Sequence, residues 1–507
     1  MSVHSSGPNA LSMRQRDRRE DIAILACLAA VTVVVHVLTG GRYGFHRDEL
    51  ATLEDARQLA WGYVAYPPVT PFFGRLSLEL FGTSLRGFRF FAAMAEAAAV
   101  FLTGRMACHL GGGRWAQLVA PVAAVPFCLG GGALMQYVSF DYLCWVLAAN
   151  FTVRLLKSGD GRWWVAIGAA IGLGMLSKYA IPFFVAGLIA GLLFTDARRY
   201  LKSKWLWYGA AVAVLIFLPN LIWEARHEFV YLDFVRHIHA RDVAVGRTRG
   251  FLPGQIQLTL LALPIGIAGL RFYLISPRYR VLAWMYLVPL ALFLIANGRD
   301  YYLAGAYPML YAAGAVRLEG WLASLRPTAA RVFRFSVWAA LLIDVGITGA
   351  ITLPLAPINS PWFKVANRLN GDFREEIGWP ELVETVARVR DSLPPEDRAH
   401  LAILGANYGE AGAVNLYGPQ YGLPNAISGV NSFWQRGYGD PPPQVVIVIG
   451  LSKQFLQTRF DSCEVVAHTW NRFGVSNEET VQHPDIFVCR GLRQGWSEFW
   501  KQFRYYG

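Results

Sequence analysis

Long apolar segments alternate with short polar segments over roughly the first 350 residues. The first run, 22–39, would cover about 27 Å as a helix, enough to cross the hydrocarbon core of a bilayer. No small-residue cleavage site follows it, so we expect an uncleaved span. The pattern predicts a polytopic α-helical membrane protein with about eleven transmembrane helices, near 22–39, 88–108, 115–135, 137–156, 163–178, 179–195, 205–222, 253–274, 280–297, 300–317 and 333–353.

Arginine and lysine gather in alternate connections between these runs. Short basic connections favour the cytoplasmic side of a membrane. The prediction is therefore a cytoplasmic N-terminal tail, 1–21, followed by a multi-pass membrane domain, 22–354, in the cytoplasmic (inner) membrane. An odd number of spans then places three segments on the periplasmic or extracellular face: the loops 40–87 and 223–252, and the C-terminal region 355–507.

The C-terminal region 355–507 differs from the rest in its pattern. The stretches HLAILG, PQVVIVIG and DIFVCRG read as buried strands, separated by helical and turn segments. The pattern predicts an extracytoplasmic α/β domain. Cys463 and Cys489 fall inside it, and in an oxidising compartment they could form a disulfide.

Composition agrees with a lipid environment. Of the 507 residues 54% are hydrophobic and only 16% are charged, whereas a soluble domain carries roughly 25% charged residues. The formal charge of +12 is spread between apolar runs and is explained by membrane topology. We therefore expect the lipid bilayer as a partner and no nucleic acid.

The loop 40–87 carries an adjacent acidic pair, Asp48 and Glu49, in the stretch HRDELATLEDARQLAWGYV. Apolar residues recur there at near-helical spacing as far as Val64, and Pro67 then ends the helix. A second amphipathic piece, FFGRLSLELFG, is expected along the interface. Two interpretations of the pair remain open: an N-cap aspartate with a glutamate favoured by the helix dipole, or catalytic carboxylates.

The order of several motifs resembles that of bacterial membrane glycosyltransferases. These motifs are HRDEL, WGYV, PP, GTSLRGFRFFAAMA, QYVSFDYLCWVLAAN, LGMLSKYAIPFF, LPNLIWEARHEF, RDYYLAGAYPMLYAAGA and NYGEAGAVNLYGPQYGLPNAISGVNSFW. The resemblance is to the GT-C superfamily, related to protein mannosyltransferases and aminoarabinose lipid A transferase. It implies inverting transfer of a hexose or pentose from a polyprenyl-phosphate-linked donor. The acceptor would be a hydroxyl or amine of a lipid, polysaccharide or protein at the outer face.

Asp48 matches the catalytic aspartate that this family has in its first outer loop, where one carboxylate suffices as general base. Glu49 would support it, and Asp141 is the second acidic position that the resemblance marks. Lys178, at the outer end of a span, is suited to neutralise a departing phosphate, although snorkelling alone would also explain it. The same reasoning adds further candidates for phosphate or sugar contacts: Arg299, Tyr301 and Tyr302.

No metal site stands out, and we expect no required cofactor, although a divalent cation is compatible with the family. His237 and His239 would need converging ligands, and a solvated loop is the simpler interpretation. Glu96 and Asp344 interrupt apolar runs, where a buried ion pair or hydrogen bond is expected. Two other functions were weighed: a secondary transporter, which would usually show two related halves, and an inactive scaffold of envelope assembly.

Overall fold

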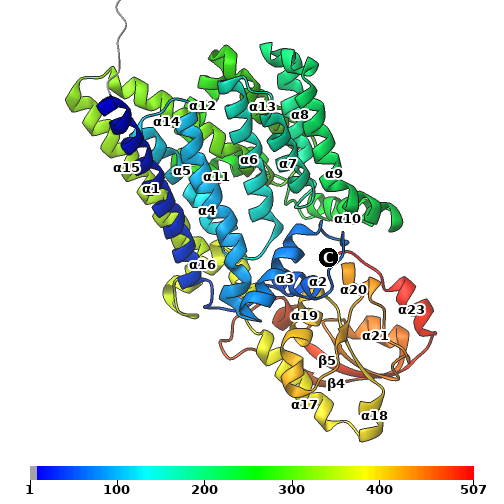
Figure 1. Ribbon diagram of the computed structural model, residues 1–507. Helices are drawn as coiled ribbons and strands as arrows, with labels where there is room; N and C mark the ends of the chain where they lie inside the picture. The colour runs from blue at the N-terminus through cyan, green and yellow to red at the C-terminus, as the bar shows by residue number, and fades with distance from the viewer. Residues whose placement is uncertain (1–7) are drawn as a thin grey trace, which may run out of the picture.

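The computed structural model describes residues 8–507, and it shows a helical bundle joined to a smaller part that contains a sheet (Figure 1). Residues 1–7 of the predicted tail 1–21 lie outside the described residues. The backbone of the rest of that tail is already helical, because the first helix begins at Pro8 rather than near residue 22.

Every predicted apolar run corresponds to helical structure in the bundle. The helices are α1 (Pro8–Thr39), α4 (Leu85–His109), α5 (Arg114–Gly131), α6 (Tyr137–Ser158), α7 (Trp163–Met175), α8 (Ile181–Phe194), α9 (Lys204–Arg226), α11 (Phe251–Thr259), α12 (Leu263–Ile275), α13 (Arg280–Ile295), α14 (Tyr307–Ala323) and α15 (Pro327–Thr352). Short 3-10 segments connect some of them: η1 (Asp196–Lys202), η2 (Leu260–Ala262), η3 (Pro277–Tyr279) and η4 (Asp300–Ala306).

Within residues 8–507, six helices are long and apolar enough to cross a membrane, or seven if the bent pair α8–η1 forms one span. The chain is therefore a multi-pass membrane protein. Other helices of the bundle are shorter, such as α7 with 13 residues, and the total of eleven spans stays a prediction.

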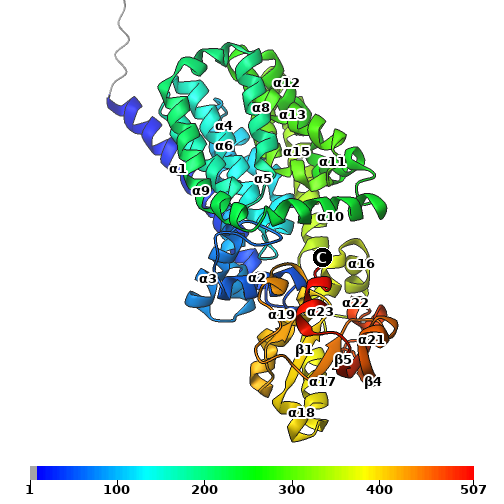
Figure 2. The same ribbon diagram turned by 90° about the vertical axis from the view of Figure 1, so that its right-hand side faces the viewer.

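The connections predicted to share the outer face do lie at one end of the bundle. The loop 40–87 forms α2 (Arg47–Arg57) and α3 (Val69–Phe81), and the loop 223–252 forms α10 (Val230–Ala244). Figures 1 and 2 show these helices at the same end as the C-terminal part, with α10 lying across the bundle, whereas α1 starts at the opposite end. Which end faces the cytoplasm stays a prediction.

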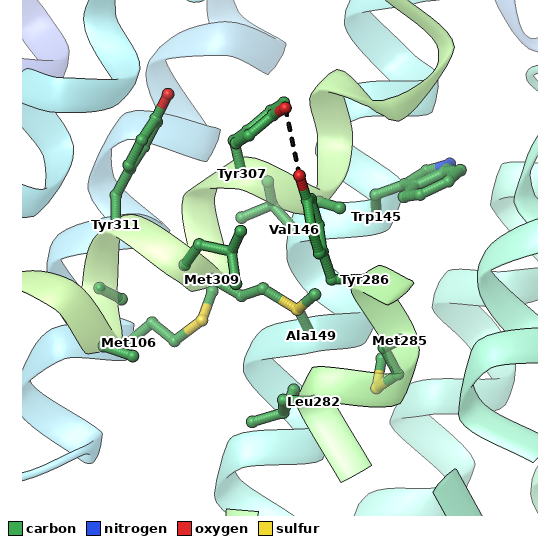
Figure 3. Packing of buried hydrophobic residues seen from close by; sticks show 14 of the residues in the cluster. Met106, Trp145, Val146, Ala149, Leu282, Met285, Tyr286, Tyr307, Met309 and Tyr311 are labelled. Atoms are coloured by element: carbon green, nitrogen blue, oxygen red, sulfur yellow. Dashed lines mark hydrogen bonds between the residues drawn. The ribbon is translucent and has the colours of Figure 1, made fainter. Parts of the chain in front are cut away.

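Small residues let the helices of the bundle approach closely, as is usual in membranes. A Cβ added at Gly168 of α7 would lie 1.9 Å from the carbonyl oxygen of Gly209 in α9. Figure 3 shows large buried side chains of α4, α6, α13 and α14, including Tyr286 and Tyr307, whose hydroxyl oxygens are 3.4 Å apart. The Tyr307 hydroxyl also donates to Gln255 Oε1 at 3.0 Å, so this buried hydroxyl has a partner.

The C-terminal part contains a five-stranded sheet in the order β2-β1-β3-β5-β4. The pairs β2–β1 and β1–β3 are parallel, and the pairs β3–β5 and β5–β4 are antiparallel. The predicted strands appear as β1, β3 and β5. The strands are β1 (Leu401–Gly405), β2 (Ala426–Ile427), β3 (Val445–Ile449), β4 (Phe460–His468) and β5 (Asp485–Leu492).

Helices flank this sheet and link it to the bundle. They are α16 (Pro361–Leu369), η5 (Gly371–Glu376), α17 (Trp379–Ser392), α18 (Pro395–Ala399), α19 (Tyr408–Tyr417), η6 (Gly418–Tyr421), α20 (Asn431–Gln435), α21 (Lys453–Arg459), α22 (Glu478–Val481) and α23 (Trp496–Gln502). A disulfide joins Cys463 of β4 to Cys489 of β5. It attaches the edge strand β4 to its neighbour, with both cysteines in register.

Helix α2 is fixed between the bundle and the C-terminal part. Its residues Leu50 and Leu53 share a buried apolar cluster with Phe88 of α4 and with Trp379 of α17. A Cβ at Gly412 of α19 would lie only 2.8 Å from the Leu50 Cβ, so α19 packs directly on α2. The start of α2 is therefore held by three separate parts of the chain.

Candidate active site

Asp48 is not the N-cap of α2, so that part of the helix-start interpretation is wrong, whereas Glu49 does stabilise the first turn. His46 holds the N-cap position, and its Nδ1 accepts from the backbone amide of Asp48 at 3.2 Å. The Glu49 carboxylate accepts from the His46 amide at 2.9 Å, which completes a capping box. Because His46 and Glu49 satisfy the helix start, the Asp48 side chain is available for other contacts.

The Asp48 carboxylate accepts two hydrogen bonds from distant parts of the chain. Gln136 Nε2 donates to Oδ2 at 3.0 Å, and the Tyr408 hydroxyl donates to Oδ1 at 2.8 Å. These donors come from the start of α6 and the start of α19. They orient both oxygens and leave 43% of the side chain exposed, so each oxygen keeps a lone pair for a substrate.

The helix also ends earlier than its apolar spacing predicts. It stops at Arg57, and the Tyr63 hydroxyl accepts from the Ala60 amide at 2.8 Å and donates to the Asp55 carbonyl at 3.0 Å. These bonds turn the chain back, so Ala60 and Val64 lie beyond the helix.

Asp48 lines a cavity of about 1140 Å³ between the bundle and the C-terminal part. Helix α10 and the start of α19 contribute to its walls. The cavity also holds Lys178, Arg299 and Tyr302 among the predicted site residues, and the lining does not include Glu49, Asp141 or Tyr301.

Lys178 lies among three tyrosine rings. Its Nζ is 4.0 Å from the ring centroid of Tyr302, 4.7 Å from that of Tyr301 and 4.9 Å from that of Tyr137. Such contacts stabilise an ammonium group in place of water. Asp141 lies behind the cavity, attracts the Lys178 ammonium electrostatically and accepts from Trp145 Nε1 at 3.1 Å. Asp141 therefore acts on the site through its electrostatic attraction to Lys178.

Arg299 is anchored from helix α10. Its Nε and Nη2 each lie 2.6 Å from Asp242 Oδ2, and Nη1 donates to the Tyr301 hydroxyl at 3.4 Å. Asp242 is only 3% exposed. The salt bridge holds Arg299 at the cavity wall and connects α10 to the segment that carries both tyrosines.

Glu49 makes structural contacts, and its assignment as a catalytic residue is not retained. The residue is fully buried. Its Oε2 lies 2.6 Å from Arg89 Nη2, and its Oε1 accepts from the Met135 amide at 2.8 Å. Arg89 also lies 3.1 Å from Glu376. Glu49 therefore joins α2 to α4 and η5 from the side facing away from the cavity.

The C-terminal wall of the cavity is rich in acidic groups. Arg47 pairs with Glu478 and, at 3.3 Å, with Glu375. Burial raises the pKa of Glu410 to about 8 and that of Glu479 to about 7. The basic groups Lys178 and Arg299 lie on the bundle side, where Arg299 is paired with Asp242.

Three of these contacts were not predicted from the sequence: Gln136, Tyr408 and Asp242. The first two lie inside motifs that carried the resemblance, QYVSFDY and NYGEAG, but nothing in their spacing relates either to residue 48. Asp242 follows His237 and His239 in the loop RHIHARD. Within residues 8–507, no three His, Cys, Asp or Glu side chains gather as a metal would require, and metal independence stays a prediction.

The two acidic residues inside apolar runs lie away from the cavity. Asp344 of α15 accepts from the Leu261 amide at 3.1 Å, where the chain breaks between α11 and α12. This interhelical hydrogen bond is the structural role expected for it. Glu96 is fully buried in α4 beside Cys128 of α5.

The fold and the sequence both relate the chain to membrane glycosyltransferases. The model of the dolichyl-phosphate-mannose-protein mannosyltransferase family matches residues 65–223. Crystal structures of ArnT from Cupriavidus metallidurans, one of them bound to undecaprenyl phosphate, superpose with TM-scores of 0.56 and 0.57 at 15% identity. They cover 92% of this chain and 97% of theirs. Over residues 65–223 the chain is thus similar to this mannosyltransferase family, and its fold resembles that of ArnT.

Two further proteins resemble the chain, one in sequence and one in fold. The lipid A galacturonosyltransferase RgtD of Rhizobium johnstonii is 25% identical over 233 residues, which are 44% of this chain and 46% of RgtD. The match thus spans about half the length of that relative. The mycobacterial arabinofuranosyltransferase AftD superposes with a TM-score of 0.56 at 13% identity, covering 93% of this chain and 42% of AftD.

Proposed function

We propose that this protein transfers a sugar from a polyprenyl-phosphate donor to an acceptor hydroxyl or amine at the outer face of the inner membrane, with inversion at the anomeric carbon. The observation that carries the proposal is the cavity between the bundle and the C-terminal part. The exposed Asp48 carboxylate, oriented by two hydrogen bonds, lines it together with Lys178 and Arg299. This is the end of the bundle where a lipid-linked sugar would meet a soluble or lipid acceptor.

The donor phosphate would bind on the bundle side. Lys178 provides an ammonium group there, 4.0 Å from the Tyr302 ring centroid, and Arg299 provides a guanidinium group paired with Asp242. Charges at such a poorly hydrated site act more strongly than in water. The polyprenyl chain would remain in the bilayer while its sugar reaches toward Asp48.

Asp48 would act as the general base. Its carboxylate removes the proton of the acceptor group while the acceptor oxygen or nitrogen bonds to the anomeric carbon. The bond from that carbon to the phosphate oxygen breaks, and its electron pair leaves with polyprenyl phosphate. Because this leaving group is a weak base, no protein acid is needed. Gln136 and Tyr408 keep the carboxylate oriented through its other lone pairs.

The test uses purified full-length protein and an Asp48→Asn variant. Each is offered a panel of polyprenyl-phosphate sugars with candidate lipid and glycan acceptors, and released polyprenyl phosphate is measured. We expect a loss in kcat of about 10²- to 10⁴-fold, the usual contribution of a general base. The amide retains one acceptor oxygen, and the Tyr408 hydroxyl can rotate, so folding should be nearly unchanged.

Glu79→Gln is the matched control, because Glu79 lies on α3 in the same loop and is 57% exposed. It should turn over like the wild type. Wild-type turnover by Asp48→Asn would remove the general base from the mechanism. Solute flux in vesicles, without turnover of any donor, would show that the protein is a transporter and not a transferase.

A further inference from the structure

The short helix α16 has an apolar face that the described chain leaves exposed. Trp362, Val365 and Leu369 recur at the spacing of one helix face, and they are 44%, 44% and 64% exposed. The opposite face is buried, because Phe363 packs in an apolar cluster with Phe373 of η5. A continuous exposed apolar face of this kind marks contact with a membrane or with another protein.

Helix α16 lies against the last turn of the span α15. The Trp362 indole Nε1 donates to the carbonyl oxygen of Ala350 at 3.1 Å, and Asn370 Nδ2, just after α16, donates to that of Ile351 at 3.4 Å. Because α15 ends at Thr352, both ends of α16 are attached at the level where the span ends. Figures 1 and 2 show α16 beside this end of α15, closer to the bundle than the sheet is.

The exposed apolar surface of α15 continues onto α16. Helix α15 is long and apolar enough to cross a membrane, and most of it is not buried by protein, as Ile343 and Ile347 illustrate. Trp362 follows at the end of the span, which is the depth where tryptophan rings gather in membrane proteins. Continuity with a lipid-facing surface therefore favours lipid over a protein partner on this face.

Basic residues flank the apolar face. Lys364 and Arg368 are one helical turn apart and exposed, and neither forms an ion pair within residues 8–507. Arg42 is exposed nearby, since its Nη1 donates to the carbonyl oxygen of Leu355 in the connection between α15 and α16. On a helix that lies in a membrane interface, basic side chains beside the apolar face attract anionic lipids. The charge of this region therefore fits anionic headgroups.

Contacts with the end of α1 hold α16 in this orientation. The Tyr43 hydroxyl donates to the carbonyl oxygen of Ala356 at 2.8 Å. The Tyr43 ring meets the rings of Phe363 and Phe373 edge-on, with centroids 5.5 and 5.2 Å apart. Because Tyr43 follows α1, the helix α16 is fixed between the ends of α1 and α15. Turning its exposed face inward would break these contacts.

We propose that α16 lies in the membrane interface, with Trp362, Val365 and Leu369 among the lipid acyl chains and with Lys364 and Arg368 at the headgroups of anionic phospholipids. The region after α15, predicted to lie outside the membrane, then contacts the bilayer through its first helix. The inference does not depend on the proposed sugar transfer.

The first measurement locates α16 relative to the bilayer. The full chain with Cys27→Ser and Cys108→Ser, whose other free cysteines are buried, receives a bimane label at Val365→Cys in nanodiscs with phospholipids spin-labelled on the acyl chain. We expect quenching to lower the fluorescence about twofold or more. A label at Glu384→Cys, an exposed position on α17, should lose none.

Equal quenching at the two labelled positions would overturn the proposal. Absence of quenching at Val365→Cys, together with disulfide-linked dimers of that variant, would assign the face to a second copy of the chain.

The second measurement tests the headgroup preference. Amide hydrogen exchange of residues 361–370 is followed in nanodiscs of phosphatidylcholine alone and in nanodiscs that also contain phosphatidylglycerol. We expect exchange about fivefold slower with the anionic lipid. Replacing both Lys364 and Arg368 by glutamine should remove this difference.

The matched control replaces Arg388 and Lys453 by glutamine. Both are exposed, on α17 and α21, which lie farther from the bundle than α16 (Figures 1 and 2). This double variant should keep the dependence on phosphatidylglycerol. No such dependence in the wild type, or the same dependence in both double variants, would overturn the assignment to anionic headgroups.

Discussion

Replacing Glu49 by glutamine separates a structural role from a catalytic one. The carboxylate faces Arg89 through three contacts, Nε to Oε1 at 2.9 Å, Nε to Oε2 at 3.2 Å and Nη2 to Oε2 at 2.6 Å. Removing one partner of a buried ion pair typically costs about 3–5 kcal/mol. Arg89 keeps Glu376 and the carbonyl oxygens of Gly40 and Gly44.

These remaining partners place the expected cost of Glu49→Gln near the lower figure, about 3 kcal/mol in the free energy of unfolding. The amide can still accept from Met135, so the local path of α2 is retained. Because Glu49 does not reach the cavity, kcat per folded molecule at low temperature should stay within about threefold of the wild type.

The assay combines thermal unfolding in detergent with initial rates at a temperature where both proteins are folded. Glu79→Gln serves as the surface control and should change stability by less than about 0.5 kcal/mol. A fall in kcat of a hundredfold or more, with unchanged unfolding temperature, would show that Glu49 takes part in the chemistry and that our assignment is wrong.

Three more predictions concern Lys178, the Cys463–Cys489 disulfide and Glu410. Lys178→Met should lower kcat/KM by about 10²-fold, because it removes the cation that would bind the donor phosphate. Lys204→Met, at an exposed position at the other end of the bundle, should leave kcat/KM unchanged. Equal kcat/KM values for the two variants would refute the phosphate-binding role of Lys178. Replacing Cys463 and Cys489 by serine should lower the free energy of unfolding of the C-terminal part by about 3.5 kcal/mol, from a sequence separation of 26, measured by proteolysis with and without reductant. Burial raises the pKa of Glu410 to about 8, so between pH 4.5 and 8 the folded state holds a proton that the unfolded state has lost, and the free energy of unfolding falls as pH rises. Glu410→Gln keeps the capping box and should make the free energy of unfolding less dependent on pH in this range. An unchanged pH dependence in the variant would show that Glu410 is not the group responsible.

The membrane helices and several strands follow from local pattern. A long apolar run needs only its own backbone hydrogen bonds to be stable in lipid, so the positions of α4, α6 and α9 are visible in the chain. The buried strands β1, β3 and β5 are likewise short apolar runs. Exact ends were less predictable: α1 starts before its apolar run, and α2 stops at Arg57 because Tyr63 turns the chain back.

The roles within the acidic pair required the fold. Asp48 and Glu49 are neighbours in sequence, but on a helix neighbouring side chains point about 100° apart. One therefore faces the cavity and the other faces Arg89. The capping role expected of Asp48 belongs to His46, and its hydrogen-bond donors Gln136 and Tyr408 come from positions 88 and 360 residues away.

The sequence by itself determined that the chain enters the membrane many times, which segments share a face, and which superfamily its motifs resemble. Each of these depends on hydrophobicity, charge or residue order, and these properties can be read from the sequence without knowing the fold. Only the tertiary structure decided which charged groups meet in one cavity, because that depends on how α2, α10 and α19 pack against the bundle.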